Sequence, residues 1–473
     1  MELRKYKLGD VLELQRGFDL SSSQMKNGDV AVVGSNGIIG YHNLPRGNTP
    51  CITIGRSGSV GKVHYYTQKT WAHNTTLFVK DFKENDPKYL YYFLKNLHLD
   101  EIFGKSSSVV PSLDRKIVHA LVVPFYKDVC IQKSISSVLS NIDSKIELNR
   151  AINDNLAKMA KQLYDYWFVQ FDFPDEIGRP YKSSGGEMVW NDKLKREIPC
   201  GWYCGTLLDI AEYTNGLACQ RFRPIDDNKL PVVKIKEMHD GLSSDTEWVR
   251  SDIPESVKVY DGDVLFSWSA SLEVMLWAYG NGGLNQHIFK VTSKNGFPRS
   301  FYFYQLIDYI GNFKRMAEAR KTTMGHITQD HLKQSTIALP QNIDIANKLE
   351  ERLCPIFYAI VKNCQEIMTL TKQRDELLPL LMNGQASLNY HLSEWHIGFY
   401  VLICTWSMTR ARHSAFCSEP FSINVKQFCH CFWAAQMVSS LYSTCMSSSL
   451  HSAMKVRNSA VLFCAGKEIF PYM

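Results

Sequence analysis

The chain repeats itself once, with a period close to 200 residues. Three groups of landmarks recur in the same order. Leu8, Asp10 and Gly17 recur as Leu207, Asp209 and Gly216, a shift of 199 residues (209 − 10). Asn74 and Phe78 recur as Asn285 and Phe289, a shift of 211 (285 − 74), and Pro124 recurs as Pro340, a shift of 216 (340 − 124). This period exceeds the tens of residues in a solenoid repeat. Each copy is therefore expected to be a domain with its own core, and the growing shift is what loop insertions produce. Two like domains on one chain suit a partner with two like sites.

Length and composition predict a folded, soluble protein of two or three domains. The chain has 473 residues, of which 45% are apolar and 21% charged. Its N-terminus, MELRKYKLGD, lacks the apolar core of a secretory signal, and no stretch of some 18 apolar residues follows. Thirteen cysteines in a chain without an export signal predict reduced thiols and no disulfides. We therefore expect a cytoplasmic protein that does not contact a membrane.

The net charge of +6 permits DNA binding without requiring it. Residues 390–473 hold six Lys or Arg against three acidic residues, so the preceding 389 residues carry only +3. A mildly basic chain binds nucleic acid when its cations gather on one face. The net charge alone therefore does not decide whether the chain binds DNA.

Each copy divides into a strand-rich part and a long helix. Residues 1–125 contain short β-branched and aromatic runs separated by Gly, Asn and Pro, namely VAVVGSNGIIGYH, TPCITIGRSGSVGKVHYY and NTTLFVKDF. Residues 131–169 contain neither Gly nor Pro, and two series recur in them every seven residues: Ile135, Ile142, Asn149, Leu156 and Leu163, with Val138, Lys145, Ile152, Met159 and Tyr166 as companions. They predict one helix of about 55 Å with an apolar seam.

The second copy repeats this helix after Pro340. Its seven-residue series is Leu349, Ile356, Asn363, Leu370 and Leu377. Asn149 and Asn363 occupy the same place in the two series, and a polar Asn in an apolar seam fixes register and partner choice. We expect the two helices to pair side by side and antiparallel. The alternative is two ordinary amphipathic helices, each packed on its own domain.

The segment between the copies is rich in Gly, Pro, Ser and charge, which is typical of a connector. It reads FDFPDEIGRPYKSSGGEMVWNDKLKREIPCGW. Three further features accompany this linker, namely the two-fold repeat, the proline before each long helix and the run DGDVLFSWSA at 261–270. On these features the chain resembles the specificity (S) subunit of type I restriction-modification systems. The resemblance covers residues 1 to about 388.

The resemblance implies an α+β fold with a pseudo-two-fold repeat, in which two strand-rich target-recognition domains are joined by two long antiparallel coiled-coil helices. The implied parts are a first recognition domain (1–130), a first spacer helix (131–170), a linker (171–199), a second recognition domain (200–341) and a second spacer helix (342–388). Each recognition domain would read one half of an asymmetric bipartite DNA target in the major groove. The coiled coil would set the gap between the halves.

The resemblance also implies that this chain is not itself an enzyme. Methylation and cleavage would be carried by separate subunits, namely two modification (methyltransferase) subunits and the restriction subunits. S-adenosylmethionine, ATP and Mg²⁺ would bind those partners, and this chain would bind none. The sequence agrees, since it contains no NPPY or DPPY tetrapeptide for a flipped base and no GxxxxGK[ST] phosphate loop. Two other classes stay open: a duplicated coiled-coil protein scaffold without DNA binding, and an enzyme with a site between the modules.

Contacts to double-stranded DNA are expected on polar, basic loops, because hydroxyl, Lys and Arg groups reach phosphates and base edges. The segments GKSSSVV (104–110) and ARKTTMGH (319–326) occupy equivalent places, and two further loops are GRSGSVG with the following Lys62, and QRFRP. The candidates from these four segments are Arg56, Lys62, Lys105, Ser107, Arg221, Arg223, Arg320, Lys321 and His326. The alternative for each is a solvated surface loop. The aromatic runs YLYYFL (89–94) and FYFYQL (301–306) are interpreted as core packing rather than as base-stacking platforms.

No metal site is expected. Cys200 and Cys204 lack a second suitably spaced pair of ligands, and a zinc site needs four. Residues 389–473 belong to neither copy and hold six of the cysteines with no clean period. We hypothesise that this tail is disordered or out-of-frame translation, so that a chain ending at Leu388 keeps partner and DNA binding.

Overall fold

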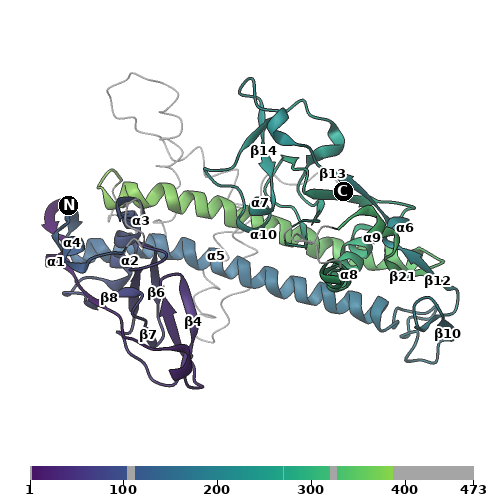
Figure 1. The fold of residues 1–473 in the computed structure, drawn as a ribbon, viewed down its shortest axis with the longest axis horizontal. Helices are drawn as coiled ribbons and strands as arrows, with labels where there is room; N and C mark the ends of the chain where they lie inside the picture. Colours follow the sequence, from purple (N-terminus) through teal and green to yellow (C-terminus); the bar gives the residue numbers. More distant parts are fainter. Residues whose placement is uncertain (1–2, 104–111, 270, 320–326, 387–473) are drawn as a thin grey trace, which may run out of the picture. The chain divides into compact units, whose positions relative to one another are not determined.

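The computed structural model describes residues 3–103, 112–269, 271–319 and 327–386, and it shows two strand-rich modules on a pair of long helices (Figure 1). The first module consists of β1 (Leu3–Lys7), α1 (Leu8–Val11), β2 (Glu13–Arg16), η1 (Ser22–Gln24), β3 (Val30–Gly34), β4 (Gly37–His42), β5 (Cys51–Gly55), β6 (Val63–Tyr66), β7 (Thr70–Ala72), β8 (Thr76–Asp81), α2 (Pro87–Asn96), α3 (Leu99–Phe103), α4 (Arg115–Ala120) and β9 (Val122–Tyr126). Its sheets have the strand orders β2-β8-β5-β6, β4-β3-β7 and β1-β9.

The second module repeats this plan with β12 (Trp202–Thr206), α6 (Leu207–Ile210), β13 (Ala211–Asn215), η3 (Cys219–Arg221), β14 (Lys229–Val233), α7 (Ile235–Asp240), β15 (Trp248–Arg250), η4 (Glu255–Val257), β16 (Lys258–Val259), β17 (Val264–Ser267), β18 (Glu273–Leu276), β19 (Gly282–Leu284), β20 (Ile288–Ser293), α8 (Arg299–Ala319), α9 (Gln329–Lys333) and β21 (Thr336–Pro340). Its sheets run β13-β20-β17-β18, β15-β14-β19-β16 and β12-β21. The predicted duplication is confirmed.

One helix closes the core of each module, and the aromatic runs predicted to be core packing lie on these helices. In α2 the Asp86 carboxylate accepts a hydrogen bond from the backbone N of Tyr89 at 2.7 Å, and Pro87 opens the first turn. Helix α2 buries Tyr89, Leu90, Tyr92, Phe93 and Leu94, and α8 buries Phe301, Tyr302, Phe303, Tyr304 and Leu306. The core-packing interpretation of both runs is therefore confirmed.

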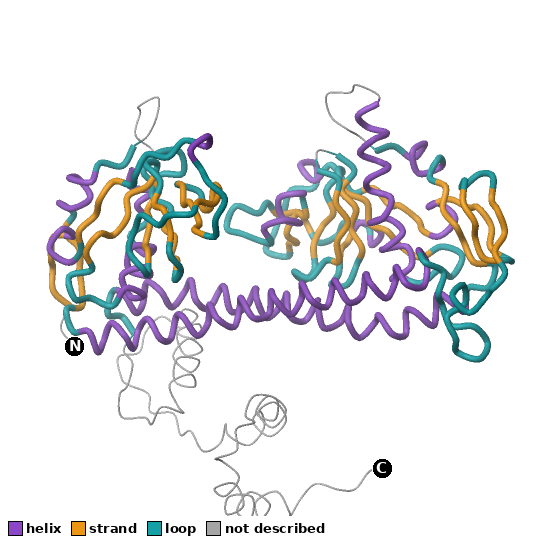
Figure 2. The backbone as a smooth tube through the Cα atoms, turned by 90° about the horizontal axis from the view of Figure 1, so that it is seen from below, coloured by secondary structure: helices purple, strands orange, loops and turns teal. Residues whose placement is uncertain are grey.

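The two long helices pair antiparallel. Helix α5 (Val129–Tyr164) continues into a π-helical turn, η2 (Asp165–Val169), and α10 (Asp344–Met382) lies beside it (Figure 2). Asp143 of α5 faces Arg374 of α10, and further along α5 Asn153 faces Asn363, so the chains run in opposite directions. The expected antiparallel coiled coil is confirmed, and the alternative of two separately packed helices is wrong.

The companion series predicted for α5 is wrong. Only Val138 of it is buried, whereas Lys145, Ile152, Met159 and Tyr166 are exposed. The buried or half-buried companions lie four residues after each seam position instead of three, at Leu139, Ile146, Asn153, Ala160 and Trp167. Because Asn153 is polar and Ala160 is small, this series does not stand out as apolar in the sequence. Helix α10 has the same arrangement, with Leu353, Ile360, Ile367, Arg374 and Leu381.

The strand registers correct the alignment of the two copies. Lys7 pairs with Val122 as Thr206 pairs with Thr336, so the shift here is 214 (336 − 122), and Pro124 corresponds to Ala338 rather than to Pro340. The His73 amide bonds to Val33 as the Asn285 amide bonds to Val233, so His73, and not Asn74, corresponds to Asn285, a shift of 212 (285 − 73). The shift of 214 equals that between Asn149 and Asn363, so the strand and helix alignments agree.

The segment predicted to be a connector folds against the second module. It contains the antiparallel strands β10 (Met188–Asn191) and β11 (Arg196–Pro199). Phe173 stacks on Tyr181 and on Trp202 with ring centroids 4.8 and 5.6 Å apart. The seven cysteines within the described residues are free. Within the same ranges no helix is long and apolar enough to cross a membrane. The hypothesis on residues 389–473 falls outside the described residues.

Candidate nucleic-acid interface

The candidate interface of the first module is built on a close crossing between the end of β2 and the chain that leads from β7 into β8. The Gly17 amide donates to the Thr76 carbonyl at 3.0 Å, and the Phe18 amide donates to the Ala72 carbonyl at 2.8 Å. A Cβ at Gly17 would stand 2.1 Å from the His73 carbonyl oxygen, so the approach requires glycine. The repeated Gly216 crosses Asn285 in the same way, with 2.2 Å from its Cβ position to the Asn285 carbonyl oxygen. This requirement explains the recurrence of the two glycines.

A cavity of about 740 Å³ opens beside this crossing, and four arginines line it. They come from distant parts of the module: Arg16 from the end of β2, Arg46 from the loop after β4, Arg56 from the loop after β5, and Arg115 from the start of α4. Asp19 and Asp114 are the acidic residues of the lining, so its formal charge is +2 (4 − 2). A concave surface of this sign attracts anions, and guanidinium groups match phosphates and base edges.

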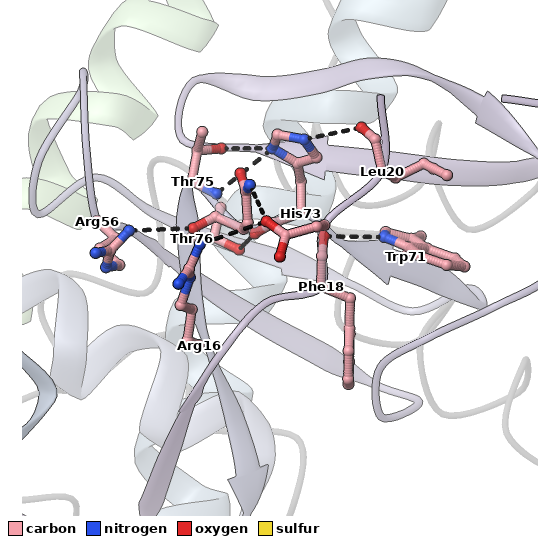
Figure 3. A network of polar contacts seen from close by, with 10 residues as sticks. Arg16, Phe18, Leu20, Arg56, Trp71, His73, Thr75 and Thr76 are labelled. Atoms are coloured by element: carbon pink, nitrogen blue, oxygen red, sulfur yellow. Dashed lines mark hydrogen bonds and ion pairs between the residues drawn. The ribbon is translucent and has the colours of Figure 1, made fainter. Parts of the chain in front are cut away.

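A polar network holds two of these guanidiniums in place (Figure 3). Arg56 Nη1 donates to the Asn74 carbonyl oxygen at 3.4 Å, and the Asn74 amide donates to the Asp19 carboxylate. Arg16 Nη2 lies 3.4 Å from the same Asp19 oxygen, in an exposed pair. In the same network His73 bonds to the Thr75 hydroxyl at 3.0 Å and to the Leu20 carbonyl at 3.2 Å. Asp19 therefore partly neutralises Arg16 and anchors the loop that positions Arg56.

The other two arginines are held differently. The Arg46 guanidinium lies over the rings of Phe18 and Trp71, 5.0 and 5.1 Å from their centroids, a cation–π arrangement. Arg115 Nη1 reaches the Leu14 carbonyl at 3.5 Å. Neither guanidinium has an ion pair among the residues that the structure describes. Both charges thus remain available to an anionic ligand.

A histidine in the last turn of α4 joins this helix to β2. His119 Nε2 accepts a hydrogen bond from the Leu14 amide at 2.9 Å. Burial, followed by the nearby charge of Arg115, lowers the pKa of His119 below its usual 6.5. The neutral imidazole is the form that can accept this bond.

Of the predicted DNA-contacting residues in the first module, Arg56 lines the cavity and Lys62 does not. Lys62 is exposed, and its Nζ donates to the Asn36 side chain at 2.7 Å. The glycine-rich run around them joins β5 to β6, as expected of a turn, and Gly58 and Gly61 have φ of +81° and +82°. The predicted Lys105 and Ser107 lie outside the described residues. Ser112, the first described residue after that segment, lines the cavity.

In the second module the predicted Arg221 and Arg223 lie on the exposed loop at and after η3. Neither forms an ion pair within the described ranges. The predicted Arg320, Lys321 and His326 are outside these ranges. At the places of Arg16 and Arg56 this module has Asn215 and Trp268, with the indole Nε1 donating to Asn215 Oδ1 at 3.1 Å. The two modules thus share a backbone frame and differ in the chemistry that they present.

The asparagines predicted to fix the helix register both bond across the helix pair. Asn149 Nδ2 donates to Glu366 Oε2 at 2.9 Å, and Asn363 Nδ2 donates to Asn153 Oδ1 at 2.8 Å. They do not bond to each other. Their effect on register stays a prediction.

Sequence reasoning missed Arg16, Arg46 and Arg115. Arg16 directly precedes the repeated Gly17, and Arg115 follows the polar segment 104–110, so both had a usable signal in the sequence. Arg46 had none, because its place depends on the packing of Phe18 and Trp71. The described residues contain no group of three His, Cys, Asp or Glu side chains that could hold a metal ion.

Comparison with known proteins identifies the family of this chain. Over residues 2–158 and 199–353 the chain matches the Type I restriction modification DNA specificity domain family. It is 29% identical over 312 residues to the Type I restriction enzyme MjaIX specificity subunit of Methanocaldococcus jannaschii, a match that covers 63% of this chain and 68% of the relative. It is 22% identical to the HindI specificity subunit of Haemophilus influenzae, covering 54% of this chain and 67% of the relative.

A solved structure shares the fold. The type I restriction-modification S subunit from M. genitalium superposes with a TM-score of 0.54 at 14% identity, covering 80% of this chain and 96% of the other. This likeness shows the shared fold of duplicated modules on an antiparallel helix pair. The matching family model and the curated relatives give the class, which is that of specificity subunits, not catalytic themselves. The chain belongs to the family of type I restriction-modification DNA specificity proteins.

Proposed function

We propose that this chain reads an asymmetric, bipartite DNA sequence, with each module reading one half in the major groove. The observation that carries the proposal is the cavity with Arg16, Arg46, Arg56 and Arg115 on a module that is fixed to a long helix pair. Arginine recognises guanine O6 and N7 in the major groove and also holds phosphates. A cationic cavity in which two guanidiniums have no ion pair to any described residue supports either contact.

The helix pair supports a fixed gap between the halves. Helix α5 has 36 residues and thus a length of about 54 Å, which exceeds one duplex turn of about 34–36 Å. Two modules tied to such a spacer gain affinity and specificity together, because the second binds as an intramolecular event.

We further propose that the chain docks two modification subunits and the restriction subunits in the cytoplasm. The bound S-adenosylmethionine, ATP and Mg²⁺ would belong to those partners. Family membership supports the assignment of partner subunits. The placement of the cofactors on those partners agrees with a sequence that lacks both the NPPY or DPPY tetrapeptide and the GxxxxGK[ST] loop.

The salt dependence of DNA binding by the full chain with its modification subunits tests this proposal. Replacing Arg16 or Arg56 with Ala should flatten the slope of log affinity against log salt by about 0.9 if the side chain contacts a phosphate. If it contacts a base, the variant should instead lose about 1–3 kcal/mol of discrimination at one position. Arg150→Ala is the control, since Arg150 is exposed on α5 and pairs with Glu147. Unchanged affinity, slope and discrimination in both cavity variants would contradict the proposal.

A further inference from the structure

A partly buried polar triad joins the first module to both long helices. The Arg374 guanidinium of α10 lies 2.9 Å from the Asp143 carboxylate of α5, and the Tyr92 hydroxyl of α2 donates to the other Asp143 oxygen at 2.5 Å. Arg374 is 17% exposed and Asp143 28%. Arg374 also pairs with its neighbour Asp375, at 2.8 Å. Burial, followed by the bond to Asp143, raises the pKa of Tyr92, which therefore donates as a neutral phenol.

The pseudo-two-fold axis relates this triad to a wholly different group. The shift of 214 between the helices maps Asp143 onto Phe357 and Arg374 onto Ala160, and both counterparts are buried. The shift of 212 maps Tyr92 onto Tyr304, whose ring centroid lies 6.0 Å from that of Phe357. An ion pair with a phenol in one half thus corresponds to an apolar packing cluster in the other.

Central contacts of the helix pair break the symmetry as well. Asn149 and Asn363 are equivalent, but Asn149 bonds to Glu366, whose counterpart is Ile152. The partner of Asn363 is Asn153, whose counterpart is Ile367. Each asparagine therefore has a polar partner for which the symmetric position offers only an apolar residue.

These differences matter because the two halves share one fold and could pair with copies of themselves. In a pair of two α5 helices, each Asp143 would face an Ala160 and lose its cationic partner. In a pair of two α10 helices, each Arg374 would face a Phe357 and keep only the half-exposed Asp375. A two-fold pair contains each mismatch twice, and a charge that is mostly removed from water is destabilising when it has lost its partner.

We propose that the Asp143–Arg374 pair is a partner-selection device. Because of this pair, α5 pairs with α10, from the same chain or from a second copy, in preference to another α5. Such a device keeps two unlike modules together and excludes symmetric assemblies of like modules. It acts by destabilising the wrong pairs, since a partly buried ion pair adds little net stability to the right one.

The first test uses the full chain cut after folding. A protease site placed between Asp192 and Lys193, in the exposed turn joining β10 and β11, would separate the halves without touching the helices. Two preparations with different N-terminal tags would be cut, mixed and warmed until the tagged N-terminal halves exchange their C-terminal partners. Capture on one tag, followed by detection of the other, measures self-pairing of the N-terminal half.

In the parent protein fewer than about 1% of N-terminal halves should be self-paired. In the variant Asp143→Leu with Arg374→Leu, self-pairing should rise at least about tenfold, because a pair of two α5 helices then contains no Asp143 carboxylate without its partner. The matched control is Glu147→Leu with Arg150→Leu, which removes an exposed pair within α5 and should leave self-pairing at the parent level. Equal self-pairing in the parent and the Asp143/Arg374 variant would overturn the proposal.

A second test needs no cutting and no exchange. Asp143→Ala and Arg374→Ala, made singly and together in the intact chain, form a double-mutant cycle on the unfolding equilibrium. Arg374→Ala removes the cationic partner of Asp143, and Asp143→Ala leaves Arg374 with only the half-exposed Asp375. The double variant should therefore be more stable than the sum of the single effects predicts, with a coupling factor of at least about tenfold. Additive effects would show that Asp143 and Arg374 do not stabilise each other, and the proposal would then fail whatever the result of the exchange test.

Discussion

The position where a Gly17 side chain would begin lies 2.1 Å from the carbonyl oxygen of His73. No Cβ fits at that distance, so Gly17→Ala must push β2 away from β7 and open the crossing on which the arginine cavity stands. We expect a loss of about 2 kcal/mol in the free energy of unfolding, as for other overpacked sites. Denaturant unfolding followed by fluorescence measures it.

Gly311→Ala is the matched control for this change. Gly311 lies in α8 with nothing within 4 Å of its Cβ position. Alanine there should be neutral or should stabilise the helix by up to about 1 kcal/mol. If both variants behaved alike, the close crossing at Gly17 would not be a structural requirement.

Asp19 limits the positive charge of the cavity. Its carboxylate faces Arg16 and accepts from Asn74, whose carbonyl positions Arg56. Asp19→Ala should raise affinity for non-specific DNA roughly two- to tenfold at low salt, because an opposing charge is gone. It should also reduce the ratio of specific to non-specific affinity, because the Arg56 loop loses its anchor. Competition binding with unrelated duplex DNA tests both effects, and a fall in non-specific affinity would refute the first.

Acidification should destabilise the first module through His119. Burial and the charge of Arg115 depress its pKa in the folded protein below 6.5, so it binds a proton less readily folded than unfolded. Its contribution is therefore constant above about pH 7 and falls as the pH drops through 6.5. Thermal unfolding between pH 7.5 and 5.5 should show a fall in Tm that His119→Gln reduces. An identical pH profile in that variant would rule out His119 as a source, and His64, whose pKa burial also lowers, would be the next candidate.

The sequence predicted the duplication, the antiparallel helices and the core role of the aromatic runs, because these depend on period and composition. It predicted the series from Ile135 to Leu163 but not the second series on the face of α5 that meets α10. This second series includes Asn153 and Ala160, whose small or polar side chains are buried only because of the partner helix. Of the four arginines that line the cavity, only Arg56 was predicted as a DNA contact. Arg46 joins the cavity through packing on Phe18 and Trp71, which no local pattern contains.

The length of the helix pair should set the gap in the recognised sequence. Adding three heptads to both helices, where Asn153 and Asn363 face each other, lengthens the spacer by about 31 Å, close to one duplex turn of about 34–36 Å. The gap should grow by about nine or ten base pairs while each module keeps its groove. One added heptad, about 10 Å, should instead weaken binding, since about three base pairs turn the second half away from its module. An unchanged gap in the three-heptad variant would show that the helices are not the spacer.

Methylation mapping tests the central claim most directly. Cells expressing the full chain with its modification subunits would be compared, by long-read sequencing, with cells lacking the chain. We predict a single methylated motif made of two fixed halves separated by a constant gap, and its loss without the chain. A continuous motif, or the same methylation in cells without the chain, would contradict the account of two modules reading two halves of one target.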